Sequence, residues 1–363
     1  MQLSIPWVDD ELREVVLARL GQNCLEEKMD KQKLNPIALA AEIETGNRRA
    51  LARAITLVES ANPDHRNQAT ELLGALTVGN QSIRIGLSGT PGVGKSTFIE
   101  SFGIKLVESD LRVAVLAVDP SSARSGGSIL GDKTRMDYLS RHPNAFIRPS
   151  PSQSHLGGVA RRTREAIALC EAAGFDIVLI ETVGVGQSET MVAEMTDLFV
   201  LLLAPAGGDE LQGVKRGIME MADLILINKA DGDLKDAATR TCADYTSALR
   251  LLRKRAQDCE GFPKSLLISS IEGDGISESW IEMKQLVEWR KQKGFWESTR
   301  ADQNMFWFNA EIRHTLLTQL EQDPEAAAAS VIMQTAIRTG KVSPSVAASR
   351  VVKSFLSSRK EFD

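Results

Sequence analysis

Short apolar runs alternate with helical stretches through the middle of the chain. Seven of these runs predict buried strands, at residues 83–87, 113–118, 145–148, 177–181, 198–203, 224–228 and 266–269. Continuous apolar runs separated by helices are typical of a mainly parallel sheet with helices on both faces. Such sheets bind ligands at the carboxyl ends of their strands. The pattern therefore predicts an α/β domain whose site lies along one edge of the sheet.

The chain on either side of this alternation reads as helical. Apolar residues at helical spacing predict a helix around residues 51–58, ended by the turn residues 62–64, and a further short helix at 69–76. Near the C-terminus, apolar residues recur every fourth position from Phe308 to Leu320, and Pro344 begins a last helix. We expect a helical extension over residues 1–80, a nucleotide-binding α/β domain over 81–290, and a helical region over 291–363.

A complete phosphate loop follows the first predicted strand. It reads G-x-x-x-x-G-K-S and is followed by a predicted helix. Its glycines let the backbone turn several N–H groups toward one anion. Lys95 can place its charge on the β- and γ-phosphates, and the Ser96 hydroxyl can bind Mg²⁺. The residues expected to hold the nucleotide phosphates are Gly89, Thr90, Pro91, Gly92, Val93, Gly94, Lys95, Ser96 and Thr97.

The strand at 224–228 leads into Asn228-Lys229-Ala230-Asp231, which is the N-K-x-D pattern of guanine-binding proteins. A carboxylate at Asp231 can accept hydrogen bonds from guanine N1 and N2, and adenine lacks that pair of donors. Asn228 would brace the neighbouring loops, and Lys229 would lie along the base. The pattern predicts that the ligand is GTP or GDP.

The last predicted strand ends at Ser269, Ser270 and Ile271. At the carboxyl edge of the sheet these residues are placed to touch the base from its other side. The alternative is an ordinary turn at a strand end, and the sequence favours neither.

A second phosphate-side motif ends the strand at 177–181. Glu181-Thr182-Val183-Gly184 resembles a D-x-x-G switch in which Glu replaces Asp. Glu181 could hold Mg²⁺ through water, and the Gly184 N–H could sense the γ-phosphate. Val185 stands where small GTPases carry a water-orienting glutamine. We therefore expect slow intrinsic hydrolysis that needs another group or a partner.

Three further loops carry candidate residues. Asp119 follows the second strand, where it can bind Mg²⁺ or orient water; the alternative is a helix cap formed with the serines after it. The glycine-rich stretch 125–136 reads as a mobile switch, with Asp132 as a further Mg²⁺ candidate. The glycine-rich loop 206–210 precedes Lys215 and could act as a third switch, in which Lys215 serves either chemistry or signalling.

Composition excludes several classes of function. The chain has 363 residues and a net charge of −5, so no overall basic field attracts nucleic acid. Arginines cluster at 161–164 and 250–255, and we interpret the second cluster as a solvated helix face. The four cysteines and four histidines show no metal-ligand spacing, and the free thiols fit a reducing compartment. With no apolar signal core and no run long enough to cross a bilayer, we expect a cytoplasmic protein with no membrane contact.

Seven segments in order resemble the MeaB/ArgK-type G proteins: GTPGVGKSTF, VDPSS, GGSILGDKTRM, HLGG, ETVGVGQSE, GGDELQGVK and INKADGD. The resemblance covers roughly residues 84–275. It implies a P-loop NTPase fold of the SIMIBI type, the class that includes the signal-recognition-particle and nickel-chaperone GTPases. It also implies that Ser96, Asp119, Asp132 and Glu181 surround Mg²⁺, and that Lys215 lies in a third switch and can swing toward the nucleotide.

The resemblance further implies a homodimer, here assigned to the C-terminal helices, that chaperones an adenosylcobalamin-dependent acyl-CoA mutase. The usual partner is methylmalonyl-CoA mutase, and some relatives serve isobutyryl-CoA or ethylmalonyl-CoA mutases. GTP hydrolysis in such proteins gates cofactor delivery and protects the mutase. Two alternatives are a nickel metallochaperone GTPase and a kinase linked to amino-acid transport. The metallochaperone needs a His- or Cys-rich tract, and the kinase needs a kinase catalytic loop. The sequence shows neither feature.

Two segments of the chain each have two possible interpretations. The run Phe306-Trp307-Phe308 reads as ordinary core, with a subunit contact as the alternative. Residues 1–80 either dock a partner or brace the α/β domain, and the sequence does not rank these two roles.

Overall fold

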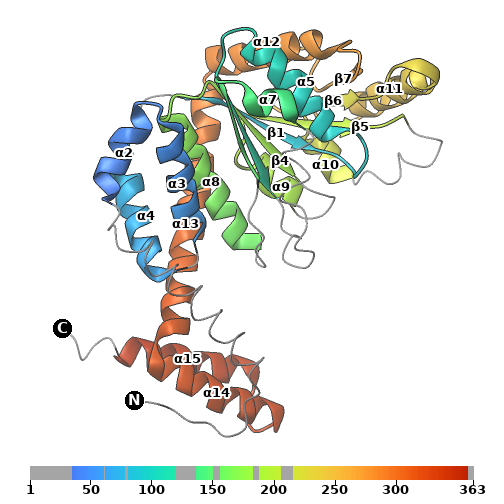
Figure 1. The fold of residues 1–363 in the computed structure, drawn as a ribbon. Helices are drawn as coiled ribbons and strands as arrows, with labels where there is room; N and C mark the ends of the chain where they lie inside the picture. Colours follow the sequence, from blue (N-terminus) through green and yellow to red (C-terminus); the bar gives the residue numbers. More distant parts are fainter. Residues whose placement is uncertain are drawn as a thin grey trace, which may run out of the picture. The chain divides into compact units, whose positions relative to one another are not determined.

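The computed structural model describes residues 35–60, 62–77, 81–118, 136–149, 156–182, 188–205 and 216–358 (Figure 1). The chain forms two compact units. The first comprises residues 1–82 and 165–176, and the second comprises residues 83–164 and 177–363.

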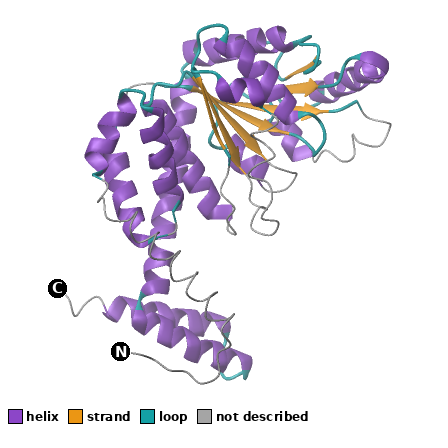
Figure 2. Cartoon of the chain, viewed as in Figure 1, coloured by secondary structure: helices purple, strands orange, loops and turns teal. Residues whose placement is uncertain are grey.

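The second unit is built on a seven-stranded sheet in which every neighbouring pair is parallel (Figure 2). The strands are β1 (Ile83–Ser88), β2 (Val113–Val118), β3 (Ala145–Arg148), β4 (Ile177–Thr182), β5 (Leu198–Leu203), β6 (Leu224–Ile227) and β7 (Lys264–Leu267). Their order is β3-β2-β4-β1-β5-β6-β7. In this order β2, β3 and β4 lie on one side of β1, and β5, β6 and β7 lie on the other. The carboxyl end of β1 is therefore a switch point of the kind where α/β sheets bind ligands.

The predicted α/β fold is confirmed, and each of the seven apolar runs overlaps a strand. The last strand lies slightly earlier than expected, at Lys264–Leu267 instead of 266–269. The reason is a turn: the Ser269 N–H donates to the Asp274 carbonyl at 2.9 Å, so Ser269 has already left the ladder with β6.

Helices lie on both sides of the sheet (Figure 2). The helices that follow β1 along the chain are α5 (Lys95–Val107), α7 (Asp137–Arg141), α8 (Leu156–Ala172), α9 (Ser188–Ala193), α10 (Arg216–Met221), the 3-10 turn η1 (Gly232–Leu234), α11 (Lys235–Arg250), α12 (Ile276–Gln292), α13 (Phe295–Gln322), α14 (Pro324–Arg338) and α15 (Pro344–Ser358). Side chains of α5 and α12 join those of the strands in one apolar core. Phe102 of α5 stacks on Phe98 at 5.2 Å and meets Trp280 of α12 edge-on at 5.9 Å. This packing holds α5, which begins at the phosphate loop, against the sheet.

The first unit contains the helices α2 (Pro36–Glu44), α3 (Arg48–Glu59) and α4 (Pro63–Ala75), with the last part of α8. The expected helix around 51–58 is confirmed as α3. The turn residues 62–64 start the next helix: the Asn62 side chain caps α4 and Pro63 occupies its first turn. The helix expected at 69–76 therefore begins six residues earlier, at Pro63. A fork of two hydrogen bonds, at 2.7 and 2.6 Å, joins Arg66 to the buried Glu165 within this unit.

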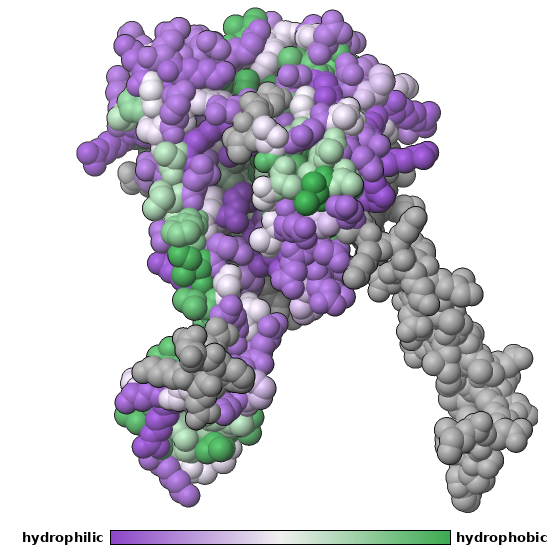
Figure 3. Space-filling model, turned by 90° about the vertical axis from the view of Figure 1, so that its left-hand side faces the viewer, coloured by the Kyte–Doolittle hydropathy of each residue, from purple (hydrophilic) through white to green (hydrophobic). Residues whose placement is uncertain are grey.

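The C-terminal helices expose much of their apolar surface. Trp307 is buried, but Phe306 and Phe308 are 49% and 59% exposed, so the core interpretation of this run is wrong for two of its three residues. Apolar side chains also lie open on α14 and α15, and Figure 3 shows green, hydrophobic areas on the surface that is drawn in colour. The exposed residues of this surface, here called the C-terminal apolar surface, are Met305, Phe306, Phe308, Ile312, Leu316, Leu317, Val331, Ile332, Ile337, Val346, Val352 and Leu356.

Each of the two arginine clusters contains residues that pair with acidic side chains. Arg161 and Arg164 each lie 3.7 Å from the Glu311 carboxylate, and Arg164 lies over the Trp307 ring. In the second cluster, Arg255 follows the end of α11 and forms ion pairs with Asp223 and Asp258. The interpretation of this cluster as a solvated helix face is therefore wrong for Arg255.

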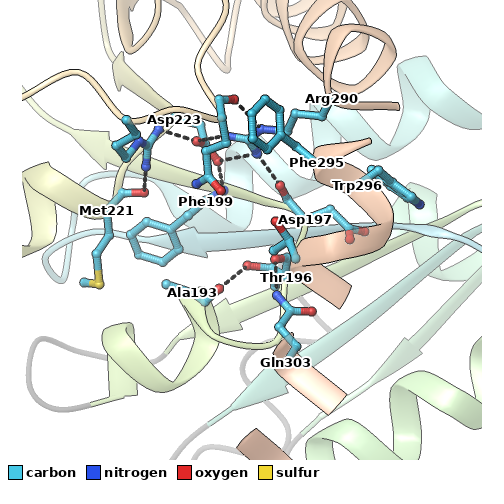
Figure 4. A pocket seen from close by; sticks show the side chains of 13 residues that line it. Ala193, Thr196, Asp197, Phe199, Met221, Asp223, Arg290, Phe295, Trp296 and Gln303 are labelled. Carbon is cyan, nitrogen blue, oxygen red and sulfur yellow. Dashed lines mark hydrogen bonds and ion pairs between the residues drawn. The ribbon is translucent and has the colours of Figure 1, made fainter. Parts of the chain in front are cut away.

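A buried ion-pair network lies at the amino ends of β5 and β6 (Figure 4). The Asp223 carboxylate accepts the Phe199 N–H at 2.8 Å and the guanidinium groups of Arg255 and Arg290 at 2.6 Å each. The Asp197 carboxylate accepts the Arg84 N–H at 2.8 Å and two hydrogen bonds from Arg300. Since Arg290 lies on α12 and Arg300 on α13, the network fastens both helices to the sheet.

Charge pairing decides the protonation of Asp223. Burial alone raises the pKa of this carboxyl, but Arg290 and Arg255 outweigh burial and hold the pKa below its ordinary value. Because the folded pKa lies below the unfolded one, the ionised carboxylate stabilises the fold above the unfolded pKa of about 4. That stabilisation is lost as the pH falls through the lower, folded pKa.

We expect Asp223→Asn to lower the free energy of unfolding at pH 7 by about 3 kcal/mol, because it removes one of the two carboxylates that balance the charge of Arg255 and Arg290. The difference from the wild type should shrink as the pH falls below about 4. Urea unfolding at a series of pH values measures both. Asp244→Asn, at an exposed position on α11, is the control. A loss that stays the same at every pH would contradict the ion-pair account.

Candidate nucleotide-binding site

The phosphate loop joins the carboxyl end of β1 to the start of α5. Gly89, Gly92 and Gly94 have φ angles of +154°, +82° and +92°, a region that favours glycine. Space is limiting at two of them as well. A Cβ on Gly89 would lie 2.3 Å from the Leu202 carbonyl oxygen, and one on Gly94 would lie 2.6 Å from the Asn228 amide nitrogen. Both positions therefore require glycine.

Lys95 is held by its own loop. Its side chain is 9% exposed, and Nζ donates to the Gly89 carbonyl at 2.7 Å and to the Thr90 carbonyl at 3.3 Å. Ser96 follows in the first turn of α5, where backbone N–H groups point out of the helix end. The ammonium group and the helix N-terminus thus concentrate positive charge at one place, as a phosphate requires.

Glu181 lies at the carboxyl end of β4, in register with Leu87 of β1, and is 4% exposed. Its neighbour Thr182 donates its hydroxyl to the Leu87 carbonyl at 3.3 Å. A hydroxyl at Ser96 and a buried carboxylate at Glu181 are oxygen donors of the kind that Mg²⁺ takes, so these two residues fit the expected metal. The other candidates on this side lie outside the described residues: Asp119, Asp132, Gly184 and Lys215.

Asn228 bridges two loops from the buried position directly after β6. Its amide nitrogen donates to the Val93 carbonyl in the phosphate loop at 2.9 Å. Its amide oxygen accepts the Ser270 N–H at 3.1 Å and the Ser270 hydroxyl at 2.8 Å. All three side-chain hydrogen bonds therefore connect the N-K-x-D segment to neighbouring parts of the site, as expected for a bracing residue.

Lys229 and Asp231 complete the N-K-x-D segment. Lys229 has a φ of +60°, which costs a non-glycine residue energy, and its Nζ donates to the Gly92 carbonyl at 2.7 Å. Asp231 accepts a hydrogen bond from the hydroxyl of the buried Ser269. Lys229 thus contacts the phosphate loop, and Asp231 contacts the turn after β7.

The residues after β7 form a tight turn and also contact the N-K-x-D segment. The Ser269 hydroxyl accepts the Glu272 N–H at 3.1 Å, while Ser269 and Ser270 bind Asp231 and Asn228 as described above. The segment therefore forms a turn at the strand end, and the same geometry leaves it next to the residues expected to read the base. Ile271 is 80% exposed, so of the three residues it alone presents its side chain to solvent.

Two residues of α5 make contacts near the site that were not predicted from the sequence. Ser101 donates its hydroxyl to the Ser270 carbonyl at 2.5 Å, which ties the phosphate-loop helix to the turn after β7. Glu100 accepts hydrogen bonds from the first turn of α7. Both are polar residues in a helix, and only the tertiary contacts distinguish them from ordinary surface positions.

We expect Gly94→Ala to reduce GTP affinity at least about tenfold, because the new methyl group combines backbone strain with contact to Asn228. Gly217→Ala on α10 is the matched control, since a Cβ there meets nothing within 4 Å. Fluorescence titration with a labelled guanine nucleotide measures both variants. Wild-type affinity in Gly94→Ala would contradict the close contact between the phosphate loop and Asn228.

Comparisons with known proteins agree with this geometry. The family described as methylmalonyl-CoA mutase-associated GTPase MeaB matches residues 51–325. A putative GTPase of Caulobacter vibrioides is 52% identical over 88% of this chain and 97% of its own. The mitochondrial methylmalonic aciduria type A homologue of Mus musculus is 48% identical over 90% of this chain and 81% of its own. The GTPase ArgK of Escherichia coli is 47% identical over 79% of this chain and 87% of its own length.

A solved structure is similar over most of the fold. The crystal structure of an LAO/AO transport system kinase superimposes with a TM-score of 0.68 at 36% identity, covering 89% of this chain and 98% of the other. Among the described residues, no helix is both long and apolar enough to span a membrane. The match to the family over residues 51–325 and the identity to these relatives show that the chain belongs to the MeaB family of P-loop GTPases.

Proposed function

We propose that this protein is a GTP-hydrolysing chaperone of an adenosylcobalamin-dependent acyl-CoA mutase, and that the mutase is methylmalonyl-CoA mutase. The observation that carries the proposal is a phosphate loop bound directly to an N-K-x-D segment, in a chain of the MeaB family. The description of that family names the mutase. Gating of adenosylcobalamin delivery, protection of the mutase and a cytoplasmic location are parts of the proposal.

Guanine selectivity in this proposal comes from Asp231. Both carboxylate oxygens would accept from the base, while the Ser269 hydroxyl orients the carboxylate. Asn228 acts indirectly, because its buried amide sets the spacing between the phosphate loop and the turn after β7. An adenine base would leave Asp231 facing an acceptor, which is unfavourable for a carboxylate.

On the phosphate side, residues 89–97 bind the nucleotide phosphates. An arriving phosphate replaces the carbonyls of Gly89 and Thr90 as the partner of Lys95. Ser96 and Glu181 would hold Mg²⁺, with Asp119 and Asp132 as the further proposed ligands. The metal ion, when bound, neutralises charge on the phosphate oxygens during transfer to water. Gly184 would sense the γ-phosphate, and Lys215 would act from the third switch.

The proposed hydrolysis is slow without a partner, because Val185 cannot orient water.

The nickel-chaperone alternative gains no support, since the described part of the chain holds no group of three or more His, Cys, Asp or Glu side chains arranged for a metal ion. Transfer of phosphate to an acceptor other than water would favour the kinase alternative.

GTP and ATP hydrolysis by the purified protein, with and without methylmalonyl-CoA mutase, tests the proposal. We expect GTP-selective turnover that rises several-fold with the mutase. Stimulation by a different acyl-CoA mutase alone would assign a different partner. Equal turnover of GTP and ATP would contradict the role of Asp231.

Two variants separate phosphate binding from base recognition. Lys95→Ala should abolish tight GTP binding, because the phosphates lose a charge-assisted partner. Asp231→Asn should shift preference toward xanthine nucleotides, because an amide can donate to the xanthine O2 carbonyl that replaces the guanine amino group. Competition binding with GTP and XTP measures both effects. Unchanged guanine preference in Asp231→Asn would contradict the proposed base reader.

We also propose that a second copy of the chain covers the C-terminal apolar surface. An exposed apolar area of this extent on three consecutive helices is typical of a subunit interface. Phe308→Glu with Val331→Glu should shift the protein from dimer to monomer in sedimentation velocity, because each buries a charge in the interface. Leu251→Glu, at a leucine 85% exposed elsewhere in the chain, is the control. A dimer that survives the double substitution would place the interface elsewhere.

A further inference from the structure

The first turn of α7 is capped by a carboxylate from another helix. Glu100 of α5 accepts, through one oxygen, the N–H groups of Tyr138 at 2.9 Å and Leu139 at 3.2 Å. The residue at the cap position, Met136, makes no side-chain hydrogen bond to the helix. Glu100 thus satisfies N–H groups that a helix start leaves without intrahelical partners, and its charge suits the positive end of the helix.

The capped helix is also packed tightly against α5, and Figure 1 shows the two side by side. A Cβ on Gly103 would lie 2.4 Å from a Leu139 methyl carbon, so α7 approaches α5 as closely as glycine allows. Met136 and Leu139 are 1% and 0% exposed. Hydrogen bonding and packing together fix α7 on the helix that starts at the phosphate loop.

This contact is one helical turn from the proposed metal site. Glu100 follows Ser96 by four residues and therefore lies on the same face of α5. At the other end of the connection, Val118 ends β2 in register with Thr182, the neighbour of Glu181. β2 therefore ends beside Glu181, and α7, where the described structure resumes, packs on the helix that carries Ser96.

One oxygen of Glu100 makes both capping hydrogen bonds, while the other is buried and has no hydrogen-bond partner among the described residues. A buried carboxylate oxygen without a partner is costly. Capping itself needs a single acceptor oxygen at this position. An amide side chain of the same length supplies that oxygen, which allows capping to be tested separately from charge.

We propose that Glu100 is a positioning residue for GTP hydrolysis. By fixing α7 on α5, it holds the end of the connection from β2 at a set place relative to Ser96 and Glu181. Glu100 acts through α7 and does not touch the nucleotide. The inference rests on the proposed GTPase function and adds a residue to it.

The test compares three variants in single-turnover GTP hydrolysis at saturating GTP and Mg²⁺. Glu100→Ala removes the acceptor, and we expect its rate constant to fall about tenfold, because small displacements of reacting groups are costly. Its affinity for GDP without Mg²⁺ should stay within about twofold of the wild type, because Glu100 contacts neither the phosphate loop nor the base reader. Glu108→Ala, at an exposed glutamate just past the end of the same helix, is the control.

Glu100→Gln provides the rescue. It keeps the acceptor oxygen, so its rate should stay within about threefold of the wild type, the loss expected from weakening a charge-assisted hydrogen bond. A Glu100→Ala rate equal to the wild type, or an equal loss in Glu100→Gln and Glu100→Ala, would overturn the proposal. Parallel loss of GDP binding and hydrolysis in Glu100→Ala would also overturn it, by showing a role in the fold only. If the wild type itself fails to hydrolyse GTP, the proposed function falls first.

Discussion

The nucleotide site depends on the buried amide of Asn228. This side chain is 2% exposed and connects the phosphate loop to the turn after β7 through three hydrogen bonds. Each such bond contributes about 1 kcal/mol, and breaking one leaves a buried polar group unpaired at a further cost. Gly94 permits the contact, because any side chain there would collide with the amide. The loop that would bind phosphate and the segments that would read the base are thus held together by one residue.

The amino ends of the strands, opposite the nucleotide site, are fixed by a different kind of interaction. There, the carboxylates of Asp197 and Asp223 bind backbone N–H groups of the strands and guanidinium groups from α12 and α13. Buried ion pairs of this type contribute little net stability against apolar packing, but losing one partner is expensive. At these ends of the strands the two carboxylates therefore fasten α12 and α13 to the sheet through contacts that are costly to break.

The sequence predicted those features that depend on local pattern. Apolar runs located the seven strands, and the spacing of glycines, Lys95 and Asp231 located the loops at their carboxyl ends. It did not predict features that depend on contacts between distant residues. Glu100 and Ser101 look like ordinary polar helix positions, and Asp197 and Asp223 look like turn residues before strands. Phe306 and Phe308 were misassigned to the core, because an apolar residue on a helix carries no local sign of whether another surface covers it.

The environment of Lys95 bears on how the loop could accept an anion. Its ammonium group is already removed from water and held by two carbonyl oxygens of the loop. The cost of desolvating that charge has therefore been met on folding. A phosphate would exchange two neutral acceptors for charged ones, and charge-assisted hydrogen bonds are about twice as strong as neutral ones. The gain on exchange comes without a new desolvation penalty for the lysine, so a preformed loop can favour a charged ligand over its own backbone.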